Sequence, residues 1–140
     1  MLLQAGAGGC RHGEVACLLI EGDHTRKAQA LYALDADWKS EAFMLVEFSN
    51  VLATYWRAGE LSRTQAVQLL AAAESRVRGL LSLPHSSALE TAHRFGVSAY
   101  DARFLAAAQK LGTRLVTEDG RLRAAAPALT RSLAEALSSG

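Results

Sequence analysis

Three acidic residues stand at positions where their type and spacing could support chemistry. Glu47 interrupts the apolar run 43–48, and at helical spacing its neighbours include Phe43 and Val51. A carboxylate on an apolar face loses hydration and is driven toward its neutral form. We therefore expect a charged partner or a metal ion beside Glu47. The structural alternative is a pairing with an arginine, or a helix rotated so that Glu47 meets water.

Asp101 and Asp119 each have a structural interpretation beside the chemical one. Asp101 stands in the first turn of a strongly helical segment, and its spacing from Ser98 is that of a capping box. Asp119 follows a short apolar segment and precedes Gly120, as a turn or N-cap aspartate does. Taken singly, either residue is explained as well by helix capping as by catalysis.

The three acids together are more informative than any one of them. Carboxylates that converge repel one another and partly protonate unless a divalent cation neutralises them. Ligand sets made only of oxygen favour Mg²⁺ or Mn²⁺, which keep waters and take phosphate oxygens as further ligands. If Glu47, Asp101 and Asp119 meet at one rim, they predict a site for phosphodiester hydrolysis, in which a metal activates water and offsets charge on the phosphate.

Length and composition limit the elements that can position these acids. The chain has 140 residues, which predicts one domain with one core. Half of the residues are hydrophobic and 21% are charged, so extended disorder and a collagen-like repeat are excluded. The sequence contains 27 alanines and 22 leucines but only two prolines, so helix is expected to dominate.

Charge and cysteine content indicate the kind of environment the chain is built for. A formal net charge of +1 argues against the uniformly basic surface of a non-specific nucleic-acid binder. No apolar stretch reaches the ~18 residues of a membrane span, and the N-terminus lacks a secretory signal pattern. Two cysteines make no disulfide framework, so we expect a cytoplasmic protein with no membrane partner. The alternative is a zinc site, although its candidate ligands match no standard finger: Cys10, His12, Cys17 and His24.

Apolar periodicity and capping residues predict helices that alternate with short strands. Helices are expected over residues 23–35, 41–58, from Ser62 onward, 86–95 and 99–111, and strands over 80–83 and 114–117. This alternation is typical of a small parallel sheet covered on both faces, an α/β three-layer sandwich whose site lies beyond the carboxyl ends of the strands. The expected inward-facing positions are Ala28, Leu31, Tyr32, Leu34, Ala66, Leu69, Leu70 and Ala73.

Three motifs, in this order, resemble the PIN-domain ribonucleases, and within them the VapC toxins of bacterial toxin–antitoxin pairs. They are Glu47-Phe48-Ser49-Asn50-Val51-Leu52, then Tyr100-Asp101-Ala102, then Leu115-Val116-Thr117-Glu118-Asp119. The resemblance extends over about residues 15–126, and it implies a PIN-like, helix-rich α/β/α sandwich with a short central parallel sheet.

The resemblance also implies residue roles and partners. Family members use these acids to hold Mg²⁺ or Mn²⁺ for RNA cleavage, so Glu47, Asp101 and Asp119 are the expected catalytic residues and metal ligands. Supporting roles, such as orienting a carboxylate or a water, are implied for Asn50, Ser98 and Thr117. The expected partners are an RNA substrate, a cognate antitoxin and a second copy of the chain. Trp38, Tyr55 and Trp56 are candidates for the partner surface, with core packing as the alternative.

The first residues depart from the family pattern, which begins with an apolar strand that ends in an aspartate. Counting back from residues 18–20 places that aspartate near Arg11, and Glu14 comes about three residues late. We therefore expect an atypical or disordered segment over residues 1–14, a PIN-like domain over 15–138, and a sheet without its central first strand.

Two hypotheses follow from this departure. The first is a metal-dependent endoribonuclease, toxin-like and impaired by loss of the first acid. The second is a non-catalytic, degenerate PIN module that binds antitoxin or RNA. A third hypothesis is a phosphatase-like hydrolase, but such an enzyme would also need an aspartate, as nucleophile, after the first strand. Arg103 could contact RNA phosphate or pair with a carboxylate.

Overall fold

A computed structural model of the chain describes residues 2–3 and 25–138. Several sequence predictions therefore lie outside the described residues. These are most of the atypical segment expected over residues 1–14, including Arg11 and Glu14, the first two residues of the helix expected over 23–35, and the zinc alternative at Cys10, His12, Cys17 and His24.

The centre of the fold is a five-stranded sheet in the order β3-β2-β1-β4-β5. The strands are β1 (Leu2–Leu3), β2 (Trp38–Glu41), β3 (Val77–Leu81), β4 (Leu115–Val116) and β5 (Thr130–Arg131). Every neighbouring pair is parallel, so the carboxyl ends of all five strands lie along the same edge.

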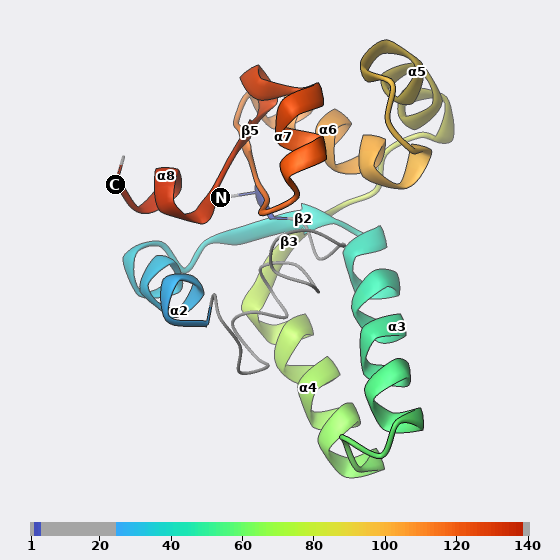
Figure 1. Cartoon of the computed structure of the whole chain (residues 1–140), viewed down its shortest axis with the longest axis vertical. Coiled ribbons are helices and arrows are strands. Elements are labelled where there is room, and N and C mark those ends of the chain that lie inside the picture. The colour runs from blue at the N-terminus through green and yellow to red at the C-terminus, as the bar shows by residue number, and fades with distance from the viewer. Residues whose placement is uncertain (1, 4–24, 139–140) are drawn as a thin grey trace.

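Helices cover both faces of the sheet, as Figure 1 shows. One face carries α5 (His85–Phe95), α6 (Ala99–Leu111) and α7 (Gly120–Ala125), and α6 contacts β1, β2 and β4. The other face carries the α3–α4 hairpin, and α2 contacts α8. The bounds of these helices are α2 (Thr25–Leu34), α3 (Phe43–Arg57), α4 (Arg63–Arg76) and α8 (Leu133–Ser138), with a 3₁₀ turn at Pro127–Leu129. The prediction of a helix-rich α/β sandwich around a small parallel sheet is confirmed.

The expectation that the first residues supply no central strand is wrong. β1 lies in the middle of the sheet, where Leu2 aligns with Lys39 of β2 and with Leu115 of β4. Two residues are too few to show an alternating or apolar pattern, so only pairing on both sides identifies this strand. Counting back from residues 18–20 placed the strand several residues too late.

Local capping signals set the bounds of the α3–α4 hairpin and of α6. Ser62 and Gln65 form a reciprocal capping box at the start of α4, and Gly59, with φ of 76°, ends the hairpin's first helix. Ser98 caps α6 and Gly112, with φ of 63°, ends it. These boundaries match the predicted ones within about two residues. The strand predicted at 80–83 is shifted, because pairing with β2 selects residues 77–81.

Strand β2 was not predicted from the sequence, and it places Trp38 in the sheet and not on a partner surface. The indole is fully buried and meets the ring of Tyr32 edge-on, with centroids 5.2 Å apart. β2 lies between β1 and β3, so Trp38 belongs to the core and not to a partner surface. Trp56, by contrast, is 47% exposed. Leu34, predicted to face inward, is exposed at the end of α2.

The other inward-facing predictions hold in part. Ala28, Leu31, Ala66 and Ala73 are buried, while Tyr32, Leu69 and Leu70 are half-buried against the core. No helix in the described part of the chain is long and apolar enough to cross a membrane.

Removal of residues 1–3 tests the role of β1. The backbone groups of β2 and β4 that face β1 would lose their partners, so we expect the free energy of unfolding to fall by at least about 3 kcal/mol in urea denaturation. Removal of residues 139–140, which follow α8, is the control and should have little effect. Equal stability of the chain that starts at residue 4 and the full chain would contradict the central placement of β1.

Candidate functional site

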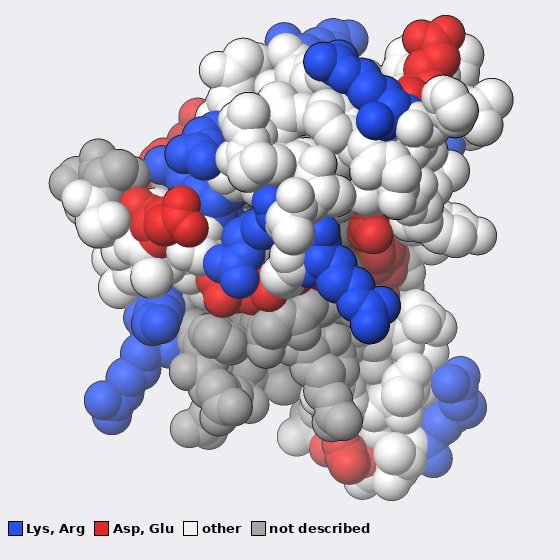
Figure 2. All heavy atoms as spheres, turned by 45° about the horizontal axis from the view of Figure 1, so that its top comes forward, with Lys and Arg blue, Asp and Glu red and all other residues white. Residues whose placement is uncertain are grey.

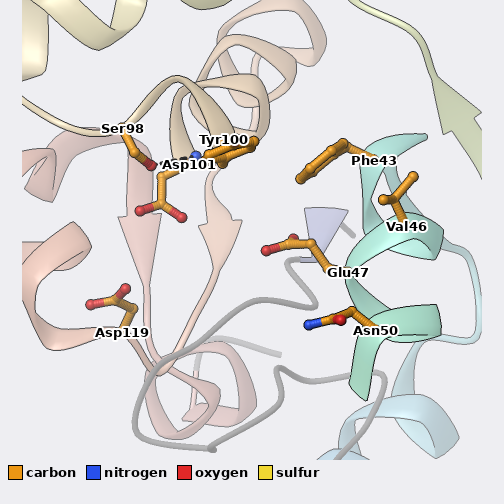
Figure 3. Close-up of a pocket in the computed structure, with 8 residues that line it drawn as sticks. All are labelled: Phe43, Val46, Glu47, Asn50, Ser98, Tyr100, Asp101 and Asp119. Atoms are coloured by element: carbon orange, nitrogen blue, oxygen red, sulfur yellow. Dashed lines mark hydrogen bonds between the residues drawn. The ribbon is translucent and has the colours of Figure 1, made fainter. Parts of the chain in front are cut away.

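A cavity of about 490 Å³ is lined by residues that approach from α3, α6 and the segment after β4. Figure 3 shows the eight lining residues, which are Phe43, Val46, Glu47, Asn50, Ser98, Tyr100, Asp101 and Asp119. All three predicted acids are therefore brought to one cavity, together with two of the predicted supporting residues, Asn50 and Ser98.

Sheet topology explains why residues so far apart in sequence meet. β2 ends at Glu41 and leads directly into α3, whose second turn carries Glu47. β4 ends at Val116, and Asp119 follows it. Because the strands are parallel, both segments leave the sheet at the same edge, where ligand sites of open α/β sheets form. The first turn of α6 brings Asp101 to the same place.

Glu47 is the acid whose charge is least compensated. The pKa of Glu47 is raised to about 7, mainly because the side chain is buried and in smaller part because the negative charges of Asp101 and Glu41 lie near it. Its Oε1 atom is buried and has no hydrogen-bond partner among the described residues. A buried carboxylate oxygen without a donor normally costs stability, so this atom is available to a ligand, a cation or a water.

A second buried acid, Glu41, was missed by the sequence reasoning. Its side chain is 2% exposed, and its Oε2 accepts a hydrogen bond of 2.6 Å from the backbone N–H of Phe43. Its Oε1 accepts a longer one, 3.4 Å, from the N–H of Leu83 and lies 3.7 Å from Arg103 Nη1. Glu41 therefore joins the start of α3 to the segment that follows β3. No local signal indicated this role, because its partners are distant in sequence.

Arg103 completes this junction from α6. Its Nη1 donates to the carbonyl of Leu83 at 3.3 Å, and its Nη2 lies 2.5 Å from Nδ1 of His85. Of the two roles considered for Arg103, pairing with a carboxylate is the one found, and the carboxylate is Glu41. Arg103 thereby ties α6, which carries Asp101, to the base of α3, which carries Glu47.

Asp101 and Asp119 both occupy the helix-terminal positions that their spacing predicted. Ser98 Oγ accepts a hydrogen bond of 3.1 Å from the N–H of Asp101. Asp119 caps α7, because its Oδ1 accepts from the N–H groups of Arg121 and Leu122 at 3.0 and 3.2 Å. The N-cap role of Asp119 is confirmed, and so is the Ser98 half of the capping box predicted for Asp101. Both carboxylates also line the cavity.

Thr117 does not line the cavity but supports a residue that does. Its side chain is buried, and its Oγ1 accepts a hydrogen bond of 3.1 Å from the N–H of Asp119. Glu118, the residue between them, caps α8 instead, with Oε1 2.6 Å from the N–H of Leu133. The turn after β4 thus directs Asp119 toward the cavity and Glu118 toward α8.

The fit of a metal ion can be judged from these donors. Carboxylate oxygens are the ligands that Mg²⁺ and Mn²⁺ prefer, and Glu47 offers an unpartnered one. Residues 2–3 and 25–138, however, contain no group of three His, Cys, Asp or Glu side chains placed to bind one metal ion together. An ion bound by Glu47 here would therefore need waters for most of its ligands.

Comparisons with known proteins add information on the fold. The sequence matches no protein-family model and no curated protein. Among solved structures, the chain is similar to the one titled "Crystal Structure of PAE2754 from Pyrobaculum aerophilum", with a TM-score of 0.76 and 20% sequence identity. The alignment covers 99% of this chain and 92% of that one. At this identity the likeness shows the fold alone.

Substitution of Glu47 by glutamine tests the electrostatic strain. An acid whose folded pKa is raised from 4.5 to about 7 destabilises the folded state increasingly as pH rises through that window. In EDTA, Glu47→Gln should therefore match the wild-type free energy of unfolding at pH 4.5 and exceed it at pH 8 by about 1–2 kcal/mol, less than the full shift because solvent screens the site.

Glu60→Gln, at an exposed position, is the control for Glu47→Gln and should show no such pH-dependent gain. A Glu47→Gln variant that is less stable than wild type at pH 8 would show that the carboxylate is stabilised where it lies.

Substitution of Arg103 by methionine tests the junction with Glu41. The change leaves a carboxylate that is 2% exposed without its cation, so we expect the free energy of unfolding to fall by about 3 kcal/mol at pH 7. Arg63→Met, at an exposed position of α4, is the matched control and should cost little. Chemical denaturation that finds both variants equally stable would rule out a structural role for the pair.

Proposed function

We propose that this protein is a metal-dependent endoribonuclease that hydrolyses RNA phosphodiester bonds. The observation that carries the proposal is the convergence of Glu47, Asp101 and Asp119 on one cavity at the carboxyl edge of a parallel sheet. The negative charges of Asp101 and Glu41, which add to burial in raising the pKa of Glu47, support it, because neighbouring negative charges attract a cation. The resemblance of the three motifs to PIN-domain ribonucleases supplies the substrate class.

Each acid has a distinct part in this proposal. Glu47 and Asp101, which interact electrostatically, would hold Mg²⁺ or Mn²⁺. Asp119 lies on the same side of the cavity as Asp101, across from Glu47, where it would bind waters of the ion. The bound ion would supply charge stabilisation for the phosphate and an activated water. Glu47 Oε1 has no hydrogen-bond partner among the described residues, so it can accept a hydrogen bond from a water of the ion. Asn50 and Ser98 line the cavity where they can orient that water.

Basic side chains lie close to acidic ones on the surface of the described residues. Figure 2 shows Lys and Arg side chains gathered across the middle of one face, with acidic side chains among them. Arg121 and Arg123 follow Asp119 directly in α7, so cationic side chains are available close to the acids. A cytoplasmic location, a cognate antitoxin and a homodimer remain predictions from the resemblance and the cysteine content.

A cleavage assay with Mg²⁺ on defined RNAs tests the proposed activity. Asp101→Asn should lower the rate by at least about a hundredfold, because it removes a charged oxygen from the cavity. Asp37→Asn, whose carboxylate is exposed and paired with Lys39, is the matched control and should cleave like wild type. Equal cleavage by wild type and Asp101→Asn, or none by wild type, would refute the proposal.

A second candidate is a non-catalytic module that binds RNA or an antitoxin. Two observations favour it: the described residues contain no group of three metal ligands, and the sequence continues from β1 with Gln4, with no acid before Glu14. Isothermal titration calorimetry with Mn²⁺, on wild type and on Asp101→Asn, separates the two candidates. Uptake of Mn²⁺ by wild type, weakened in Asp101→Asn, supports the ribonuclease, and no uptake by either protein supports the binding module.

A further inference from the structure

The cavity that holds the acids also has an apolar rim. Phe43, Val46 and Tyr100 line the same cavity, and Val46 and Tyr100 are 57% and 64% exposed. Single exposed apolar residues are ordinary on protein surfaces, but these stand together at the mouth of a charged site. In Figure 3 the two rings lie side by side between α3 and α6, with Glu47 and Asp101 next to them.

The two aromatic rings form a fixed stack. Their centroids are 5.4 Å apart and their planes are inclined by 22°. Phe43 is half-buried and packs against the core, so it anchors the stack to α3. Tyr100 stacks on Phe43 and nevertheless keeps most of its side chain exposed to solvent. The structure therefore presents a supported, flat, apolar surface.

Helix geometry places this surface directly beside the acids. Phe43 and Glu47 are four residues apart on α3 and so lie on the same face, and Tyr100 precedes Asp101 in the first turn of α6. A ligand bound at the carboxylates would therefore lie beside the stacked rings. A nucleotide carries a planar base and a phosphate on one sugar, and this combination matches a flat aromatic face beside a cation-binding pocket.

We propose that the Phe43–Tyr100 stack is a subsite for an unpaired nucleobase, on which the base adjoining the phosphate at the carboxylates stacks. This inference rests on the proposed function and extends it to how the substrate is held. Stacking on an aromatic ring requires a base with a free face, so the subsite accepts flexible single-stranded positions and not bases inside a duplex. It tolerates different bases, because each base has a π-face.

A binding experiment that holds charge constant tests the subsite. Fluorescence anisotropy would compare an oligouridylate with an abasic ribose–phosphate oligomer of the same length, at low salt in Ca²⁺, which takes the same oxygen ligands as Mg²⁺. Wild type should bind the oligouridylate about tenfold more tightly. Tyr100→Ala should abolish that ratio, and Tyr100→Phe should keep it. Leu89→Ala, at an exposed apolar position of α5, should also keep it.

The possible outcomes separate the subsite from the proposed function. If wild type binds the oligouridylate and the abasic oligomer with nearly equal affinity, or if Tyr100→Ala leaves the affinity ratio unchanged, the subsite is refuted even if RNA is cleaved. A ratio that depends on Tyr100 upholds the subsite even if wild type cleaves nothing, in which case only the activity fails. If wild type shows no ratio and Tyr100→Ala dissociates a dimer in sedimentation, the rim is a protein interface and the inference is wrong.

Discussion

Like charges share a partly dehydrated region at the carboxyl edge of the sheet, and the arrangement of the site depends on how each charge is compensated. Glu41 is buried but receives two backbone N–H groups and the guanidinium of Arg103. Asp119 receives the N–H groups at the start of α7. Glu47 has a raised pKa and a buried oxygen without a hydrogen-bond partner among the described residues. The uncompensated carboxylate is the one that a cation or a reacting water would complete.

Glu41, whose charge is compensated, helps to hold Glu47 in place. Glu41 sits where β2 becomes α3, and it binds the first N–H of α3. Arg103, two residues after Asp101, reaches the same carboxylate from α6. The charge pair thus fixes the relative positions of the two helices that bring Glu47 and Asp101 together. Burying such a pair contributes little net stability, but removing one partner leaves a costly buried charge, so the pair specifies geometry.

The site joins two kinds of surface that are usually separate. Its acids suit a hydrated divalent cation, and its rim offers the stacked rings of Phe43 and Tyr100. Both originate from the first turns of α3 and α6: Phe43 and Glu47, four residues apart, share one face of α3, and Tyr100 and Asp101 follow each other in the first turn of α6. The likeness to PAE2754 extends over almost the whole chain and establishes the fold, while the chemistry is argued from the side chains of this protein.

The amino-acid sequence alone determined the features that depend on near neighbours. Glu47 on an apolar face, Ser98 before Asp101, and Asp119 before Gly120 are patterns within one or two helical turns, and caps and apolar periodicity mark helices at that range. The helices α3 to α6 were therefore predictable within about two residues, and so were the three acids that line the cavity. Only the tertiary structure revealed strands β1 and β2, the burial of Trp38, and the ion pair between Glu41 and Arg103. Strands of two and four residues are too short to carry a periodic signal, and a charge pair 62 positions apart exists only after the sheet has aligned β2 with α6.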